Sequence, residues 1–272
     1  MPQIVHPPAA VSGVSRENVF HVLDEAGMKH GSASVIEYIN EALLPDRPLN
    51  YHVSISAMDV RAFDMLIGAV LARAIGLTRR QPDLRARVYV PCRPADVDLL
   101  RNLQAYGFQN DDAEIHMRRV LAPEDEMPGP PVGCVIASVI VDTQDDCERL
   151  LRRVNKYSLI SKPMSWLSRL MAEQFFAVYG VWQDDKLLGE LILSAYGNEG
   201  RIEMLYTRPA YRNRGVASAL VAYAGSVLLS AGIRYVNTEV WRRNRNAMAL
   251  FLGRNFDSLL PIVLYPGIDL KE

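Results

Sequence analysis

The sequence predicts an α/β protein with two domains, and three observations support this. Its 272 residues, 49% of them hydrophobic, suffice to bury two cores of ordinary size. Apolar residues recur with strand and helix periods in turn along most of the chain. The acidic, proline-rich segment 122–131 cannot be a core element and separates the two halves. We therefore expect one domain at residues 1–121, a linker at 122–131 and a second domain at 132–272.

Composition excludes several classes of protein. The formal net charge is -1, so no overall basic field would attract nucleic acid or an anionic membrane. No apolar run is long enough to span a bilayer, and residues 1–11 lack the pattern of a signal peptide. Cys92, Cys134 and Cys147 are odd in number and have no histidine at metal-ligand spacing. We expect reduced thiols, no metal site and a cytoplasmic protein.

In the first half, the patterns predict two helices and then alternating strands and helices. The two helices are expected at 16–26 and 32–44, the second ending at Pro45 because proline cannot continue a helix. The elements that follow are a strand at 51–56, a helix at 59–77, a strand at 87–91, a helix at 96–106 and a strand at 114–121.

The second half has a related order of elements. We expect a strand at 132–141, helices at 144–155 and 164–174, strands at 175–182, 187–195 and 201–207, a helix from Val216, a strand at 234–241, a helix at 243–254 and a strand at 256–264. Both halves end in strand, helix, strand, helix, strand, and a shift of 148 positions lays Phe108 on Phe256. Either the chain contains a degenerate duplication or two α/β units are alike by chance.

A basic turn at the start of the helix from Val216 is the main functional signal. The first N–H groups of a helix have no intrahelical partner and its dipole is positive there, so such a turn can hold a phosphate. The turn combines small residues with donors and charge: Arg212, Asn213, Arg214, Gly215, Val216, Ala217 and Ser218. The alternative is an ordinary crossover whose glycine packs against a strand and whose arginines are solvated.

Two motifs resemble those of the GNAT superfamily of acyl-CoA N-acyltransferases. Arg212-x-x-Gly215-x-Ala217 after a strand is similar to the family's first signature, and the stretch from Asn244 to Phe256 is similar to its downstream motif. The resemblance covers residues 132 to about 264 and only faintly the first half. It implies a mixed, mostly antiparallel central sheet flanked by helices, with a second, smaller α/β domain of similar order. It also implies an enzyme that transfers acetyl from acetyl-CoA to a primary amine.

The resemblance assigns cofactor roles to particular positions. The backbone from Arg212 to Ala217 would hold the coenzyme A pyrophosphate, with Ser218 close by. The backbone of Leu205, Tyr206 and Thr207 would receive the pantetheine arm and the acetyl carbonyl, where neighbouring strands part. Asn244 would contact the pantetheine or its phosphate end. The neighbouring arginines either meet the ribose phosphate or form a solvated helix start: Arg242, Arg243 and Arg245.

Transfer to an amine also needs a general base and a general acid. Glu203 stands where some members carry a general base, and the alternative is a strand glutamate that faces solvent. Phe251 stands where a tyrosine often protonates the leaving thiolate, and phenylalanine has no hydroxyl. Either water or another group acts as the acid, or the protein binds acetyl-CoA without turnover, as a sensor or interaction scaffold. The other tyrosines that we consider for the acid are Tyr206, Tyr211 and Tyr265.

The first half lacks the phosphate turn. Residues 56–62 contain no glycine and place Asp59 where an anion would sit, so we expect this domain not to bind coenzyme A. It would support the catalytic domain, cover part of the acceptor cleft, or form a homodimer. The acceptor amine is not defined by the sequence. Residues 157–166 either shape its pocket or form a packed connector, and the basic residues nearby favour either an acidic acceptor or a solvated face: Arg152, Arg153, Lys156 and Lys162.

Overall fold

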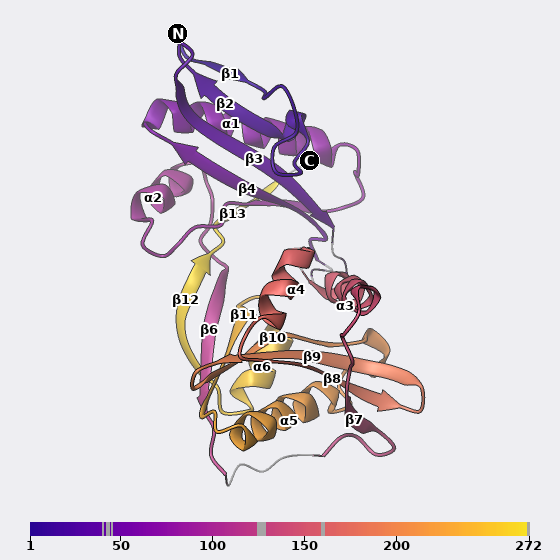
Figure 1. Cartoon of the computed structure of the whole chain (residues 1–272). Coiled ribbons are helices and arrows are strands. Elements are labelled where there is room, and N and C mark those ends of the chain that lie inside the picture. Colours follow the sequence, from indigo (N-terminus) through magenta and orange to yellow (C-terminus); the bar gives the residue numbers. More distant parts are fainter. Residues whose placement is uncertain (40, 42–43, 45, 124–128, 159–160, 271–272) are drawn as a thin grey trace. The chain divides into compact units, whose positions relative to one another are not determined.

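In the computed structural model, the chain folds into two compact units (Figure 1). The N-terminal unit comprises Met1–Ala113 and Val263–Glu272, and the C-terminal unit comprises Glu114–Ile262. The structure describes all residues except 40, 42–43, 45, 124–128, 159–160 and 271–272. The unit limits differ from the expected 1–121 and 132–272, because a strand of the first half joins the second sheet and the last strand joins the first. Half of the expected linker, 124–128, lies outside the described residues.

The N-terminal unit is a six-stranded sheet with a long helix on one face. Its strand order is β1-β2-β3-β4-β5-β13, and neighbouring strands are antiparallel except for β4 and β5, which are parallel. The elements are β1 (Gln3–Val5), η1 (Arg16–Asn18), β2 (Val19–Leu23), β3 (Lys29–Ile39), β4 (Leu49–Ala57), α1 (Val60–Thr78), β5 (Ala86–Tyr89), α2 (Val97–Ala105) and β13 (Gly267–Leu270).

The prediction of helices at 16–26 and 32–44 is wrong, because these segments mainly form the strands β2 and β3. Within β3, Gly31, Ala33 and Val35 are buried while the residues between them are not, which is the period of two of a half-buried strand. Gly27, with φ 79°, provides the turn between the two strands. Pro45, which we expected to end the second helix, lies outside the described residues.

The C-terminal unit is built on a seven-stranded sheet of order β12-β6-β11-β10-β9-β8-β7. The pairing of β10 with β11 is parallel, whereas β6–β11, β9–β10, β8–β9 and β7–β8 are antiparallel pairs. This confirms the expected mixed, mostly antiparallel sheet. The elements are β6 (Ala113–Val120), β7 (Val135–Ser138), α3 (Gln144–Tyr157), α4 (Met164–Met171), β8 (Phe175–Gln183), β9 (Lys186–Tyr196), β10 (Glu199–Thr207), η2 (Pro209–Tyr211), α5 (Val216–Ser230), β11 (Tyr235–Trp241), α6 (Arg245–Leu252) and β12 (Asp257–Leu264).

Helices cover this sheet through apolar contacts that suit their composition. Helix α3 begins at a capping box in which Thr143 and Asp146 satisfy each other's backbone N–H groups. Its apolar side packs with α4 and with Val178 and Ile192 of the sheet. Helix α5 is apolar on most sides and lies close to β10, because Gly200 has no side chain: a Cβ there would lie 2.5 Å from Leu228 Cδ1.

The two units share an order of elements. Strands β4 and β5 are parallel and connected through α1, as β10 and β11 are through α5. In the C-terminal unit α3 and α4 lie between β7 and β8, whereas no described helix longer than the short η1 lies between β1 and β2. Strand β6 follows α2 in the chain but pairs with β11, and β13 from the chain's end pairs with β5. Each sheet therefore contains a strand from the other half of the sequence.

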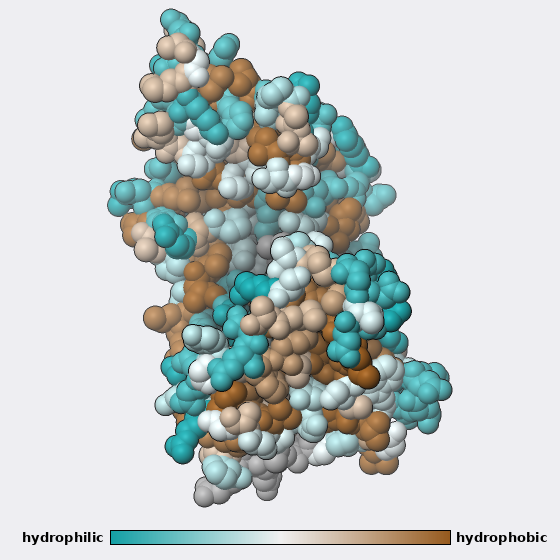
Figure 2. All heavy atoms as spheres, viewed as in Figure 1, coloured by the Kyte–Doolittle hydropathy of each residue, from teal (hydrophilic) through white to brown (hydrophobic). Residues whose placement is uncertain are grey.

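The surface of the described residues is mixed in polarity. Hydrophilic residues gather over α3 in the space-filling view, among smaller apolar areas (Figure 2). Among the described residues no helix is long and apolar enough to cross a membrane. The three cysteines are free thiols; Cys92 and Cys147 are buried, and Cys134 is half-buried.

One buried histidine in the N-terminal unit has an altered titration. His52 on β4 is 6% exposed, and neither of its ring nitrogens has a hydrogen-bond partner among the described residues. Three aromatic rings surround it: Tyr38, Tyr89 and Tyr265. Burial lowers the pKa of His52 to about 4, because the charged imidazolium is poorly solvated there.

Stability should therefore decrease as the pH falls. The unfolded chain takes up a proton on His52 near pH 6.5, whereas the folded chain does so only near pH 4. Between pH 7 and pH 5 this difference removes about 2 kcal/mol of the free energy of unfolding. His52→Phe should lose correspondingly less over that range in urea titrations, and His6→Phe, at an exposed histidine, should behave like the parent. An equal loss in His52→Phe and parent would contradict the assignment.

Candidate active site

The strands β10 and β11 part within the sheet of the C-terminal unit. Their parallel register runs from Glu199 opposite Tyr235 to Ile202 opposite Thr238 and ends there, although β10 continues to Thr207 and β11 to Trp241. On its other side β10 stays paired with β9 as far as Thr207. The last residues of β10 therefore have one edge that β11 does not pair, which provides backbone groups for a ligand.

The loop after β10 has a shape suited to an anion. It passes through η2 and enters α5 with Asn213 at φ 59° and Gly215 at φ 82°, so two left-handed residues turn the backbone just before the helix. Arg212, Asn213 and Arg214 are exposed, and Arg212 Nε donates to the carbonyl oxygen of Thr207 at 3.4 Å. The expected order of strand, turn and helix is confirmed, and the first N–H groups of α5 begin directly after Gly215.

A contact at the start of α5 was not expected from the sequence. The Arg254 guanidinium donates to Ser218 Oγ, with Nε at 2.8 Å, from the turn between α6 and β12. It adds a cation beside the positive end of the helix, where an anion is stabilised. The sequence gives no signal for this pair, because 36 positions separate the two residues.

Glu203 lies at an irregularity of β10. The register with β9 shifts between Ile202 and Met204, so Glu203 is the extra residue of a β-bulge. Its side chain is 11% exposed, and its Oε1 accepts from Ser194 Oγ at 2.8 Å and lies 3.6 Å from Arg201 Nε. The carboxylate is thus neither simply exposed to solvent nor buried without a partner.

Tyr206 belongs to a buried polar network on the α3 side of the sheet. Its hydroxyl donates to Glu190 Oε2, and its ring stacks on Tyr157 with centroids 4.3 Å apart. Glu190 is 1% exposed and accepts from Arg153 at Nε (2.8 Å) and Nη2 (2.7 Å). Burial, followed by the nearby Glu190 carboxylate, raises the pKa of Tyr206 far above its ordinary value. A hydroxyl held in this way is a poor source of a proton for a thiolate.

The downstream motif forms α6 and its flanking turns. Asn244 caps the helix, with Oδ1 accepting from the N–H of Ala247 at 3.1 Å. Phe251 is 4% exposed and packs edge-to-face on Phe256, at 5.0 Å between centroids. Asn255, at the end of this motif, has φ 59°, a left-handed conformation that asparagine adopts more readily than most residues.

The connector between α3 and α4 is described except for 159–160. Asn155 closes it by donating to the carbonyl oxygen of Lys162 at 3.1 Å and accepting from its N–H at 2.6 Å. The Lys162 ammonium lies 5.7 Å from the Trp166 ring centroid. Arg152 pairs with Glu148 at the surface, at 3.9 Å. Arg153, in contrast, points into the network of Glu190, and among the described residues it is the one basic side chain of this region that does so.

The parted strands and the turn before α5, on this sheet, define the class of N-acyltransferases with the GNAT fold. Residues 142–256, which form most of the C-terminal unit, match the model of the acetyltransferase (GNAT) family. Members of this family transfer acyl groups from acyl-CoA. The expected class is thereby confirmed, whereas the individual site residues remain predictions.

Solved structures are similar over both units. A GCN5-related N-acetyltransferase from Sphaerobacter thermophilus matches 95% of this chain and 82% of its own, with 16% identity and a TM-score of 0.54. A GCN5-related N-acetyltransferase from Kribbella flavida matches 92% of this chain and 59% of its own, with 14% identity and a TM-score of 0.51. These likenesses extend to the fold. No curated protein matches the sequence significantly.

The Glu190 network should contribute strongly to stability. Glu190→Ala leaves the Arg153 guanidinium and the Tyr206 hydroxyl without their acceptor, and we expect a loss of about 3 kcal/mol in the free energy of unfolding. Glu148→Ala, which removes an exposed carboxylate of α3 that pairs with Arg152, should cost about 0.5 kcal/mol or less. Chemical denaturation measures both, and equal losses would rule out a special role for the buried pair.

Proposed function

We propose that this protein is an N-acetyltransferase that moves the acetyl group of acetyl-CoA to a primary amine of a small molecule or peptide. The observation that carries the proposal is the parting of β10 and β11 immediately before the left-handed turn at the start of α5. A thioester arm can then lie along the free edge of β10 while its phosphates meet the helix start.

The cofactor residues follow from this arrangement. The pyrophosphate lies on the backbone of Arg212, Asn213, Arg214, Gly215, Val216 and Ala217, with Ser218 beside it. Arg254 supplies a further cation through its contact with Ser218. The pantetheine arm and acetyl carbonyl take the backbone of Leu205, Tyr206 and Thr207. Asn244 and Phe251, on α6, border the same cofactor, Asn244 through the amide nitrogen that its capping role leaves available.

Reversing charge at the turn should abolish cofactor binding. Arg212→Glu combined with Gly215→Glu places two carboxylates where the pyrophosphate lies, and we expect at least about a hundredfold weaker binding of acetyl-CoA by calorimetry. The matched control is Gly232→Glu with Arg234→Glu, which makes the same charge change at a glycine of φ 78° beyond the other end of α5. Unchanged affinity for acetyl-CoA in the Arg212→Glu, Gly215→Glu variant would rule out the proposed cofactor site.

The transfer proceeds by direct attack. The amine nitrogen forms a bond to the acetyl carbonyl carbon, the carbon–sulfur bond breaks, and the thiolate of coenzyme A leaves with the electron pair. Glu203 takes the proton of the amine, directly or through water, and water returns a proton to the thiolate, since Phe251 has no hydroxyl. A backbone N–H of β10 near Thr207 stabilises the carbonyl oxygen as negative charge develops on it.

Glu203→Gln keeps the size of the side chain but removes the base. We expect kcat to fall by about a hundredfold, with little change in the affinity for acetyl-CoA. Glu199→Gln on the same strand, an exposed carboxylate paired with Arg118, should retain activity. Release of coenzyme A with a panel of primary amines gives the rates, and equal rates in both variants would exclude Glu203 as the base.

A second candidate function is a sensor that binds acetyl-CoA without turnover. Phe251 favours it, since it is buried against Phe256 and offers no acid, while the Tyr206 hydroxyl is held by Glu190. Binding of acetyl-CoA with no release of coenzyme A across the amine panel would support the sensor over the enzyme.

The N-terminal unit is proposed as a relative that does not bind coenzyme A. At the start of α1, where the C-terminal unit has its glycine turn, Asp59 Oδ1 accepts from the N–H of Ala62 at 2.8 Å. Its carboxylate also pairs with His30. A fixed negative charge thus occupies the position of a phosphate.

A further inference from the structure

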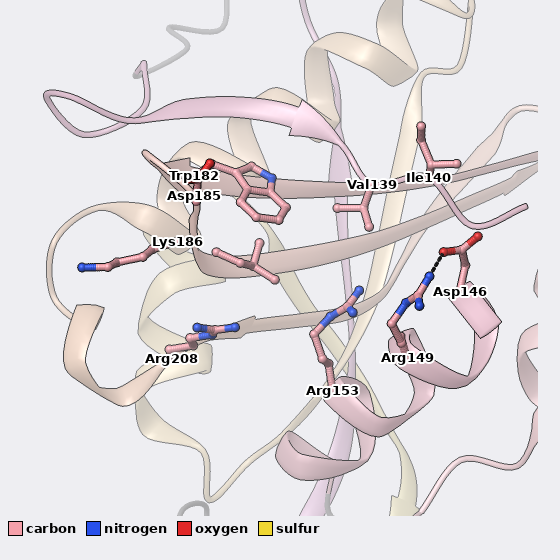
Figure 3. Close-up of a pocket in the computed structure, with 10 residues that line it drawn as sticks. Val139, Ile140, Asp146, Arg149, Arg153, Trp182, Asp185, Lys186 and Arg208 are labelled. Atoms are coloured by element: carbon pink, nitrogen blue, oxygen red, sulfur yellow. Dashed lines mark hydrogen bonds and ion pairs between the residues drawn. The ribbon is translucent and has the colours of Figure 1, made fainter.

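A cavity of about 340 Å³ lies within the C-terminal unit, beside α3 and the hairpin of β8 and β9 (Figure 3). Its volume is at the lower end of the range for small-molecule sites. None of its lining residues belongs to the turn or strand edge assigned above to the cofactor. What this cavity could bind must therefore be inferred from the side chains that line it.

Apolar and basic side chains share the lining. Val139, Trp182 and Leu187 contribute apolar surface, and the close-up shows Arg149 and Arg153 reaching into the same space from α3. Arg208, the first residue after β10, reaches toward it from the other side. A ligand that fits would thus combine an apolar body with negative charge.

Two of these cations are already neutralised. Arg149 donates from Nη2 to Asp146 at 2.6 Å, and Asp146 is ionised because the Thr143 hydroxyl, followed by Arg149, holds its pKa well below its ordinary value. Arg153 pairs through Nε and Nη2 with the buried Glu190. Tyr206 also lies beside this guanidinium. A guanidinium carries five N–H donors, and among the described residues Nη1 of Arg153 has no hydrogen-bond partner, so it can contact a ligand in an orientation fixed by Glu190.

Arg208 is the cation left without a counterion. It is half-buried and lies near the Tyr206 hydroxyl. Among the described residues its side chain has no hydrogen-bond or ion-pair partner. Its position is fixed by its backbone N–H, which donates to the carbonyl oxygen of Leu188 at 2.9 Å. Lys186 is exposed and points away from the other lining side chains in Figure 3, next to the exposed Asp185. A half-buried guanidinium without a partner is costly unless an anion joins it.

We propose that this cavity binds a small organic anion, whose carboxylate or phosphate is held between Arg208 and Arg153 and whose apolar body rests on Trp182 and Leu187. Bidentate contact with guanidinium groups suits planar carboxylates and phosphates. Trp182 provides a flat apolar wall for a ring or a branched chain. The proposal does not depend on acetyl transfer and stands or fails separately from it.

Phenylacetate is a suitable probe, with benzyltrimethylammonium and 2-phenylethanol as the cationic and neutral molecules of similar shape. The quaternary ammonium has no N–H, so it cannot serve as an acyl acceptor. By calorimetry on the full chain, phenylacetate should bind saturably and at least about tenfold more tightly than the other two. Its binding should also change tryptophan fluorescence in the parent but not in Trp182→Phe. No saturation up to about 10 mM, or equal binding of benzyltrimethylammonium, would overturn the proposal.

Arg208→Gln and Lys186→Gln form the matched pair of variants, since each removes one cation of the lining. Arg208→Gln should weaken phenylacetate binding by about tenfold or more, and Lys186→Gln by about twofold or less. Circular dichroism confirms that both fold. Saturating acetyl-CoA should leave phenylacetate affinity unchanged, whereas mutual displacement would show that the anion occupies the cofactor site and would overturn a separate site. Equal affinities of Arg208→Gln and Lys186→Gln for phenylacetate would also overturn the proposal.

Discussion

The parallel pairing of β10 with β11 is the constraint on which the C-terminal unit depends. Two parallel neighbours need a crossover, and α5 is that crossover, so its first turn must lie near the carboxyl end of β10. The pairing stops at Ile202, and the strand edge, the left-handed turn and the helix start then follow one another along the chain. One short stretch thereby holds both the exposed backbone and the positive helix end.

The neighbouring pair of strands, β9 and β10, is held to helix α3 by charged side chains. Glu190 on β9 lies opposite Tyr206 on β10 and draws Arg153 of α3 onto the sheet. A buried carboxylate is tolerated because a bidentate guanidinium and a hydroxyl satisfy it. Helix α3 is consequently fixed both by its apolar side and by one ion pair, and the cavity beside it has a rigid wall.

Much of the fold could be predicted from the sequence where periodicity is strong. The helix over Val60–Thr78 and all strands from β8 to β11 were expected within a few residues, as was the turn from Arg212 to Ser218. The strands β2 and β3 were not, because Val19 and Leu23 also fit helical spacing and only alternating burial separates the two patterns. The pairs Arg254–Ser218 and Arg153–Glu190 could not be predicted either. Their residues are 36 and 37 positions apart in the sequence, and only the fold brings them together. The placement of β6 in the second sheet and of β13 in the first has no local signal in the sequence.

That exchange has a consequence for how the protein can be divided. The sequence suggests a cut in the acidic linker, yet a fragment beginning at residue 132 would lack β6, which lies between β12 and β11 in its sheet. The complementary fragment would lack β13 and leave β5 as an open edge. The two halves of the sequence are therefore not two independent modules, because each sheet is complete only with a strand from the other half.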